Sequence, residues 1–450
     1  MEKSSILRLK FYFFTFLWEC FIILLARKIF DTFYFVKGYN INYDIESKLL
    51  VFLSMFLALM PAFFMPLENK APSSAFFIIL YYFHIIPSII LFPVILSDYS
   101  EYIILIFLIF FMLIFTLYLI SYQFLLKKID ITNIIISKKR SSFLYMGRII
   151  IIIVICIGYL TLIKTFGLNF SVPSIFSVYT QRKLFKEELI NLPKITLYII
   201  TNFAYVLSPF LIIKGVTSDK IFKKILFILI AFATTLYLFS LAGFKSSIFA
   251  IAISFIIYLL LRKSYTYVYT LSKYIIILSI TLGVFYFLIH NSILDTLILH
   301  WLRRVTIVQG LNVAYHIDYI MSNDLILTHI PFYKYSSPII SETYYGTSGN
   351  APAGILGSMF EIYGVIGIFI TLILLTFFLI SIDTLAKYFK EEIIVSLSVS
   401  IFYIITGTSI TTIFFTYGFI LLLMLFYFKF YNKNWRKYDY LQFNINSLKA

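Results

Sequence analysis

The feature that most constrains this chain is a series of about twelve apolar segments, each close to the length that crosses a membrane. A helix needs about 20 apolar residues to span a hydrocarbon core about 30 Å thick. The segments lie at 11–27, 49–66, 75–96, 102–126, 149–166, 196–213, 222–242, 246–261, 274–290, 355–380, 393–407 and 410–428. They predict an all-α, polytopic integral membrane protein with about twelve transmembrane helices. Between 222 and 261 only a short polar interruption occurs, which predicts a tight helical hairpin.

The composition excludes a sizeable soluble domain. Hydrophobic residues make up 61% of the chain and charged residues only 13%, whereas a soluble domain usually carries about 25% charged residues. We therefore expect residues 1–450 to form a single membrane domain. Lys3, Arg8 and Lys10 precede the first apolar segment and no small-residue cleavage site follows it, which predicts a retained signal anchor.

The distribution of Lys and Arg predicts the orientation, because these residues concentrate in the cytoplasmic connections of membrane proteins. If both termini are cytoplasmic, 24 of the 37 Lys and Arg residues lie inside and 13 lie outside. In the opposite orientation most Lys and Arg residues would lie outside, contrary to this rule. We therefore predict that both termini are cytoplasmic.

The formal net charge of +16 could suggest a nucleic-acid partner. Most of this charge, however, lies in short inside connections such as 138–140 and 220–224. Topology and anionic lipid headgroups account for basic residues in such places. We expect no nucleic acid among the partners.

Two predicted outside segments are longer than simple connectors, namely 167–195 and 291–354. The first carries the polar run 179–188. The second is a large, partly helical loop between spans nine and ten. It opens with an amphipathic stretch at 293–305, whose apolar residues recur at helical spacing, and it ends in a turn-rich polar strip at 344–354. We expect the residues that carry out the function of the protein to lie in these segments.

Some basic residues lie outside, against the topology rule: Arg182, the neighbours Arg303 and Arg304, and Lys245 in a very short connection. An anionic substrate held at the membrane surface would explain them. The planar guanidinium of Arg can bind phosphate oxygens in a bidentate way, and Lys acts as a point charge. The alternative is that these side chains reach toward lipid headgroups. Both interpretations stay open at this point.

Metal chemistry is poorly supported by the sequence. The five histidines are His84, His290, His300, His316 and His329. No two of them have the spacing of paired metal ligands, and His316 followed by Asp318 is weak evidence by itself. Cys20 and Cys156 lie in apolar segments and offer neither a disulfide framework nor a metal site. We expect no metal, and we expect His84 to be a hydrogen-bonded packing residue.

Few ionisable residues remain within the predicted spans, the most notable being Glu19 and Glu361. A charge at the centre of a membrane helix costs about 2.5–3.5 kcal/mol on insertion scales. We therefore expect both to lie near helix ends or to face a polar cavity. The spans are otherwise poor in the ionisable relays that ion-coupled transporters commonly use.

Three features of the chain resemble the Wzy-type O-antigen polymerases. The turn at 241–248 is similar to a Gly-x-Arg turn that opens a span in that family, with Lys245 in place of Arg. The run 179–182 lies outside between spans five and six. The late loop contains Arg303 and Arg304. It closes on a string similar to the Pro-x-x-x-Gly, Glu-x-Tyr and glycine-rich helix start of the family: Ser348, Gly349, Asn350, Ala351, Pro352, Gly357, Glu361, Tyr363, Gly364 and Gly367.

The resemblance implies a membrane glycosyltransferase of the bacterial inner membrane that acts on its outer face. A hydroxyl group of an undecaprenyl-diphosphate-linked repeat unit would attack the anomeric carbon of the growing chain, and undecaprenyl diphosphate would leave. The reaction needs no nucleotide, metal or cofactor, because the leaving group is already good. A co-polymerase that sets chain length is the partner that the family implies.

The resemblance also implies roles for individual residues. A positive field on the departing diphosphate would come from Arg182, Lys245, Arg303 and Arg304, and Tyr179 and Asn350 are further substrate-binding candidates. A general base would assist the attacking hydroxyl. Its candidates are His300, His316, His329, Glu342 and Glu361, with His316 and Glu361 slightly ahead.

Three other functions remain as alternatives. One is a polymerase for capsule, common antigen or another surface glycan. An O-antigen ligase has a similar architecture but transfers the finished chain to the lipid A core. A lipid-linked oligosaccharide flippase also has many spans and internal basic residues. Flippases generally show two related halves and small loops, whereas no internal repeat is visible here and the segment 291–354 is long. These considerations favour the polymerase.

Overall fold

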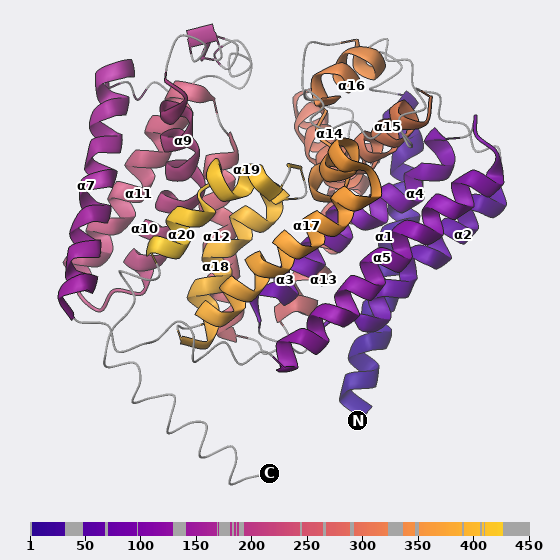
Figure 1. Ribbon diagram of the computed structural model, residues 1–450, viewed down its shortest axis with the longest axis horizontal. Helices are drawn as coiled ribbons and strands as arrows, with labels where there is room; N and C mark the ends of the chain where they lie inside the picture. The colour runs from indigo at the N-terminus through magenta and orange to yellow at the C-terminus, as the bar shows by residue number, and fades with distance from the viewer. Residues whose placement is uncertain are drawn as a thin grey trace. The chain divides into compact units, whose positions relative to one another are not determined.

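The fold is that of a computed structural model, in which all regular secondary structure of the described residues is helical and no strand occurs among them (Figure 1). The described residues are 2–31, 48–67, 71–96, 98–128, 141–168, 170, 181, 184–185, 187–188, 193–243, 245–263, 267–288, 292–322, 336–346, 351–388, 391–405, 407–408 and 410–425. The all-α prediction is confirmed for this part of the chain.

The apolar segments form helices at the predicted places. Among the described residues, eight helices are long and apolar enough to cross a membrane: Ser5–Ile29, Pro72–Ile95, Glu101–Leu126, Ile149–Phe166, Ile195–Val216, Ile221–Leu241, Tyr269–Leu288 and Ile366–Ala386. Three further predicted segments coincide with shorter apolar helices, Lys48–Phe64, Ser246–Leu261 and Ile393–Phe402. The last segment is divided between α19 (Ile410–Phe415) and α20 (Phe419–Leu425) by a turn in which Gly418 has a φ of 83°. Long apolar helices of this number are those of a multi-pass membrane protein.

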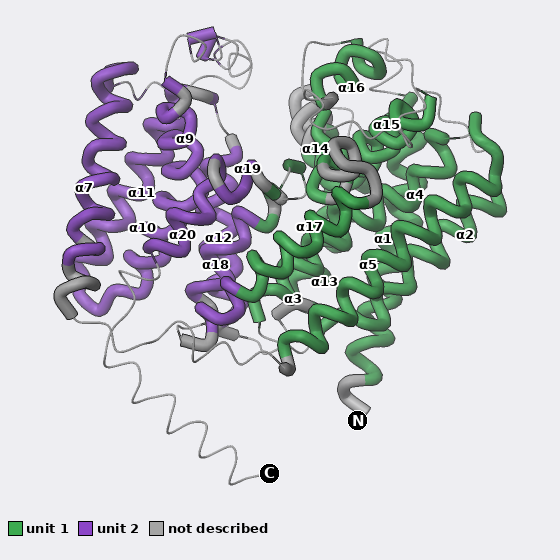
Figure 2. The backbone as a smooth tube through the Cα atoms, viewed as in Figure 1, with its two compact units in different colours: residues 1–129, 264–380, 402–410 green, residues 130–263, 381–401, 411–450 purple. Residues whose placement is uncertain are grey.

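The chain forms two compact units (Figure 2). Unit 1 comprises residues 1–129, 264–380 and 402–410, and unit 2 comprises 130–263, 381–401 and 411–450. The helices of unit 1 are α1 (Glu2–Ile29), α2 (Lys48–Leu59), η2 (Met60–Phe64), α3 (Pro72–Leu80), η3 (Tyr81–Ile85), α4 (Ile86–Ile95), α5 (Glu101–Lys128), α13 (Tyr267–Leu288), α14 (Ser292–Thr306), α15 (Val308–Ser322), α16 (Ser336–Tyr345) and most of α17 (Gly354–Tyr388). Those of unit 2 are α7 (Ser141–Phe166), α9 (Lys194–Asn202), η4 (Phe203–Leu207), α10 (Ser208–Val216), α11 (Ile221–Ala242), α12 (Lys245–Lys263), most of α18 (Glu391–Ile405), most of α19, and α20.

The central helix of unit 1 is the continuous run α3–η3–α4, whose apolar window is entirely buried. Its middle segment, η3, is a π-helix that ends two residues before Pro87. A proline cannot donate the usual backbone hydrogen bond, which favours such an interruption. In the π-turn the amide of Ile86 bonds to the carbonyl of Tyr81. The carbonyl of Tyr82 instead accepts a 3.2 Å hydrogen bond from the indole Nε1 of Trp18 in α1.

The central helix of unit 2, α9–η4–α10, repeats this local pattern. Its π-helical segment η4 also ends two residues before a proline, Pro209. In an α-helix the amide of residue 209 would bond to the carbonyl of Tyr205, which proline cannot do. The Oγ atom of Ser400 donates to that carbonyl at 2.9 Å in its place. In each unit, one carbonyl near the π-segment that lacks its usual helical partner therefore accepts a hydrogen bond from a side chain of another helix of the same unit.

The predicted helical hairpin at 222–261 is confirmed in unit 2. Helix α11 ends at Ala242, and Gly243 follows with a φ of 60°, donating its amide to the carbonyl of Phe239. Helix α12 begins two residues later at Lys245, and the two helices pack together. Glycine suits the left-handed backbone of this cap because it has no Cβ atom.

Glu19 was expected near a helix end or facing a polar cavity, and the structure contradicts the first of these two positions. Helix α1 begins at Glu2 rather than near residue 11, so Glu19 lies close to the middle of the span Ser5–Ile29. Its side chain is fully buried. Glu361 lies in α17, but its side chain is outside the described residues.

Candidate functional site

The candidate site residues from the sequence fall into three groups. Tyr179, Arg182, His329 and Asn350 lie outside the described residues. Lys245, His300 and Glu361 have described backbones, in α12, α14 and α17, but their side chains are not described. The side chains that the structure does describe are those of Arg303, Arg304, His316 and Glu342. All four belong to α14, α15 and α16 of unit 1.

Helices α14 and α15 form a hairpin that is joined at a single buried residue, Ile307. The amide of Ile307 bonds to the carbonyl of Arg303, and the amide of Leu311 bonds to the carbonyl of Ile307. Helix α14 packs against α1 and α13 and buries its apolar face: Ile298, Leu302 and Val305. The predicted amphipathic helix is thus confirmed. Arg303 is half-buried and Arg304 is exposed in its last turn.

Helix α15 packs along α4 and η3 at very close range. A Cβ atom added to Gly310 would lie 2.4 Å from the carbonyl oxygen of Pro87, so only glycine permits this approach. One turn further along α15, Val313 lines a small pocket together with His84 and Ser88 of the central helix. At the other end of α15, Asp318 binds Tyr99, which follows α4. The helix therefore runs beside the second half of the central helix, as seen in Figure 1.

This packing places α15 alongside a span and not beyond its end. The candidate span Pro72–Ile95 has 24 residues, which is about 36 Å of helix. Pro87 precedes Ile95 by eight residues, or about 12 Å along the axis. With 15 residues, α15 is too short to span a membrane, and its length is typical of a buried or re-entrant segment. The segment 291–354 is therefore only in part a connecting loop.

The carboxylate of Asp318 joins two tyrosines from different elements. Its Oδ1 atom accepts a 2.7 Å hydrogen bond from the hydroxyl of Tyr99. Its Oδ2 atom accepts a 2.6 Å hydrogen bond from the hydroxyl of Tyr344 in α16. The ring of Tyr344 also stacks on Tyr315, with centroids 4.3 Å apart and planes at 15°. We call Asp318, Tyr99, Tyr344 and Tyr315 the aspartate clasp. It holds α16 and the α4–α5 connection to α15.

A second set of hydrogen bonds from α15 holds the segment that precedes α17. Asn312 accepts from the hydroxyl of Tyr345 at 2.7 Å and donates its amide to the carbonyl of Pro352 at 3.1 Å. The Nε2 atom of His316 lies 2.7 Å from the carbonyl oxygen of Ala351. A carbonyl can only accept, so this nitrogen carries the proton. His316 is buried, and this hydrogen bond gives it a positioning role, because it holds the segment before α17 against α15.

From the sequence His316 was named but Asn312 was not, and Asp318 was noted only as weak evidence of a metal ligand. Asn312 and His316 are four residues apart and thus share one face of the helix. Two polar residues at that spacing in an otherwise mostly buried helix are a sequence signal for a hydrogen-bonding face. Tyr99 carried no such signal, because its partner Asp318 is 219 positions away. Within the described part of the chain, no three His, Cys, Asp or Glu side chains gather in a way that could hold a metal ion.

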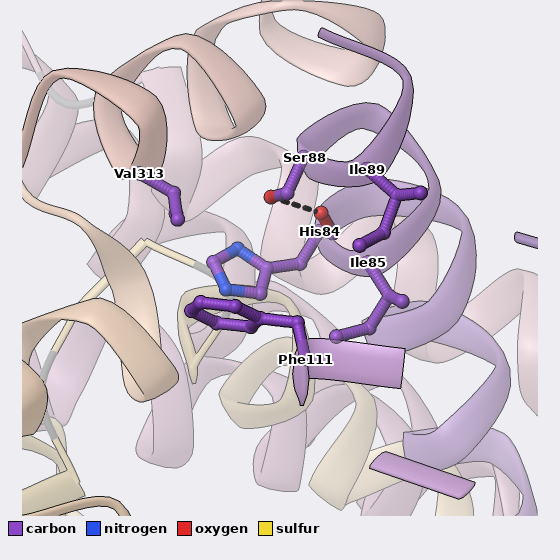
Figure 3. Close-up of a pocket in the computed structure, with 6 residues that line it drawn as sticks. All are labelled: His84, Ile85, Ser88, Ile89, Phe111 and Val313. Atoms are coloured by element: carbon purple, nitrogen blue, oxygen red, sulfur yellow. Dashed lines mark hydrogen bonds between the residues drawn. The ribbon is translucent and has the colours of Figure 1, made fainter. Parts of the chain in front are cut away.

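His84 occupies the only π-helical segment of unit 1's central helix, inside the packed core (Figure 3). It was predicted to be a hydrogen-bonded packing residue, and its burial beside Phe111 and facing Val313 confirms only the packing. Its backbone carbonyl accepts from the Oγ of Ser88 at 2.6 Å. The Nδ1 atom of its ring has no hydrogen-bond partner among the described residues. The adjoining pocket has room for about one water molecule.

The clasp predicts a specific effect of Asp318→Asn. An Asn side chain keeps one acceptor oxygen, but its amide cannot accept, so one tyrosine loses its partner. Hydrogen bonds to charged groups contribute about 1.5–3 kcal/mol each. We therefore expect amide hydrogen exchange in α16 to accelerate by about 10- to 100-fold. The matched control is Asp98→Asn, an exposed carboxyl next to Tyr99. Equal exchange in the two variants would contradict the clasp.

The clasp also predicts a loss of stability in alkali. Burial, and then the hydrogen bond to Asp318, raise the pKa of the hydroxyls of Tyr99 and Tyr344 above the usual value. Both are favoured as neutral donors in the folded state. Their contribution is complete below about pH 10, the pKa of a free tyrosine, and is lost as the pH rises through their raised values. When the absorbance of tyrosinate is followed as the pH is raised, the Tyr99→Phe/Tyr344→Phe variant should lose amplitude in the late phase, which is the part of the titration at the highest pH. Removal from the early phase would refute this assignment.

No protein-family model, curated protein or solved structure matches this chain.

Proposed function

We propose that this chain is a glycosyltransferase of the bacterial inner membrane that joins undecaprenyl-diphosphate-linked repeat units into a surface polysaccharide. Both termini are cytoplasmic in this proposal, and the chain crosses the membrane about twelve times. The α4–α5 connection, the outer ends of α14 and α15, and α16 then face outward. The distribution of Lys and Arg supports this orientation.

The order of groups along the α14–α15 hairpin carries the proposal. The basic pair Arg303–Arg304 lies in the last turn of α14, just before the buried turn at Ile307, and Gly310, which follows that turn, contacts Pro87. Polar and aromatic side chains follow along α15 toward its other end, which finishes at the aspartate clasp. A lipid-linked saccharide has the same order, because its diphosphate adjoins the lipid and its sugars extend away from the membrane. The hairpin thus offers cations to the diphosphate and polar groups to the sugars.

The reaction proceeds by displacement at the anomeric carbon of the growing chain. A hydroxyl oxygen of the incoming repeat unit forms the new bond, the bond to the diphosphate oxygen breaks, and the hydroxyl proton passes to a base. Arg303 and Arg304 stabilise charge on the departing diphosphate. Asp318 joins His316, Glu361 and His300 as a candidate base, since its carboxylate is already oriented by two hydroxyl donors. Arg182, Tyr179, Lys245 and Asn350 remain predictions for substrate binding, and a chain-length co-polymerase remains the expected partner.

Deletion of the gene, with electrophoresis of the surface polysaccharide, tests the proposal. A polymerase deletion should leave lipid A core that carries a single repeat unit and no ladder of longer chains. Plasmid-borne wild-type protein should restore the ladder. Complete absence of repeat units on the core would refute polymerase activity and would favour the ligase or the flippase. Purified protein with the lipid-linked repeat unit as its sole substrate should lengthen it, which neither alternative can do.

A further inference from the structure

Glu19 is an ionisable side chain buried near the middle of a membrane-spanning helix, away from the site described above. It lies close to the centre of the span Ser5–Ile29, and its exposed fraction is 0%. Neither carboxyl oxygen has a hydrogen-bond partner among the described residues. No described Lys, Arg or His forms an ion pair with it. An intramembrane carboxyl without a counter-ion calls for a functional explanation.

The neighbours of Glu19 are polar but uncharged. Tyr12 and Thr15 share its face of α1, at positions i−7 and i−4. Tyr81 and Tyr82 of η3 lie close enough to interact with it electrostatically. Their hydroxyls are engaged elsewhere, since Tyr81 donates to the carbonyl of Ala58 at 2.6 Å and Tyr82 pairs with Thr15 at 2.9 Å. The other titratable group nearby is the thiol of Cys20.

None of these neighbours supplies a positive charge, and this absence determines the protonation state of the Glu19 carboxyl group. An ionised Glu19 would be a buried charge without a counter-ion, which is strongly disfavoured. Two ways of removing the charge exist: a bound cation or a bound proton. No second carboxylate is seen beside Glu19 among the described residues, so the acidic ligand set that commonly attracts a hard cation is missing. A proton needs only the one carboxyl group.

We propose that Glu19 is a proton-binding site in the membrane core of unit 1, occupied at neutral pH. Loss of the proton would place a negative charge next to η3, where Trp18 and Thr15 tie α1 to Tyr82. The bound proton therefore keeps the contact between α1 and the central helix intact. This inference does not depend on the proposed glycosyl transfer.

Infrared difference spectroscopy of the full-length protein in lipid vesicles at pH 7 tests this site. A protonated carboxyl group has a carbonyl stretching band that is distinct from the bands of a carboxylate. We expect the Glu19→Gln variant to lose a protonated-carboxyl band relative to the wild type. Glu19→Asp should shift that band without abolishing it, which gives a second reading if Glu19→Gln folds poorly. The control is Glu101→Gln, which removes an exposed carboxyl in the first turn of α5 and should remove carboxylate bands only.

Two outcomes would overturn the proposal. Loss of carboxylate bands from Glu19→Gln would show that the side chain is ionised. Appearance of the protonated band only after Na⁺ and K⁺ are replaced by choline would identify a metal-cation site in place of a proton site.

Discussion

Replacing Arg303 and Arg304 together by alanine is expected to abolish the polysaccharide ladder while the protein remains folded. The two guanidinium groups are the cations nearest the buried turn of the hairpin in the described part of α14 and α15. Removing one preorganised donor from a developing negative charge usually costs about 10²–10³ in rate, or about 2.7–4 kcal/mol. Loss of both should leave no visible chain extension. Lys at both positions keeps the charge but loses the bidentate fork, so partial activity is expected.

The matched control for the arginine pair is Arg27→Ala. Arg27 is an exposed basic residue in the last turn of α1, which also belongs to unit 1. If the loss of any positive charge near the outer surface were enough to stop polymerisation, Arg27→Ala would impair it as strongly as the paired variant. We expect a full ladder from Arg27→Ala, with protein levels and thermal unfolding in detergent equal for all variants. A normal ladder from the Arg303→Ala/Arg304→Ala protein would remove the hairpin from the candidate site.

Gly310→Val is expected to displace α15 from the central helix of unit 1. The new Cβ would lie 2.4 Å from the carbonyl oxygen of Pro87 and 2.8 Å from the amide nitrogen of Ser88. Backbone atoms in a fully packed helix cannot yield as a flexible side chain can. Overpacking usually costs about 1–3 kcal/mol, and more where backbone must move. We expect a clear fall in the thermal unfolding midpoint, together with loss of polymerisation, because both arginines are attached to the same hairpin.

The control for Gly310→Val is Ser322→Ala on the same helix. Ser322 is exposed at the end of α15, and its hydroxyl makes a 3.3 Å bond to the carbonyl of Tyr319 within the helix. This substitution should change the unfolding midpoint little. If the two variants unfold at the same temperature, the close contact between α15 and Pro87 is not part of the folded state.

Several features were accessible from the sequence because they depend on one helix at a time. The apolar length of the spans, the hairpin at Gly243 and the amphipathic helix that carries Arg303 and Arg304 all follow from local periodicity and turn chemistry. The hairpin and the amphipathic helix were predicted correctly in type and place, whereas the first helix begins earlier than its predicted apolar segment and the last predicted span is divided into two short helices. The π-segments also have a local cause in Pro87 and Pro209, although sequence reasoning did not use it.

The candidate site was predicted only in part. His316 and the arginine pair were named, and Asp318 was noted only as a weak metal ligand. The clasp was missed because Asp318 meets Tyr99 across 219 positions and Tyr344 across 26. The location of Tyr179, Arg182 and Asn350 lies outside the described residues, so their roles stay predictions.

The sequence by itself determined that this is an all-helical, multi-pass chain with a basic amphipathic helix before its tenth predicted span. The tertiary structure alone decided that this helix and α15 form a hairpin packed into unit 1, with Gly310 against Pro87. It also decided that Glu19 is central and buried. The physical reason is that the buried face of a helix follows from the spacing of apolar residues along that helix, whereas the pairing of polar groups depends on which helices pack together.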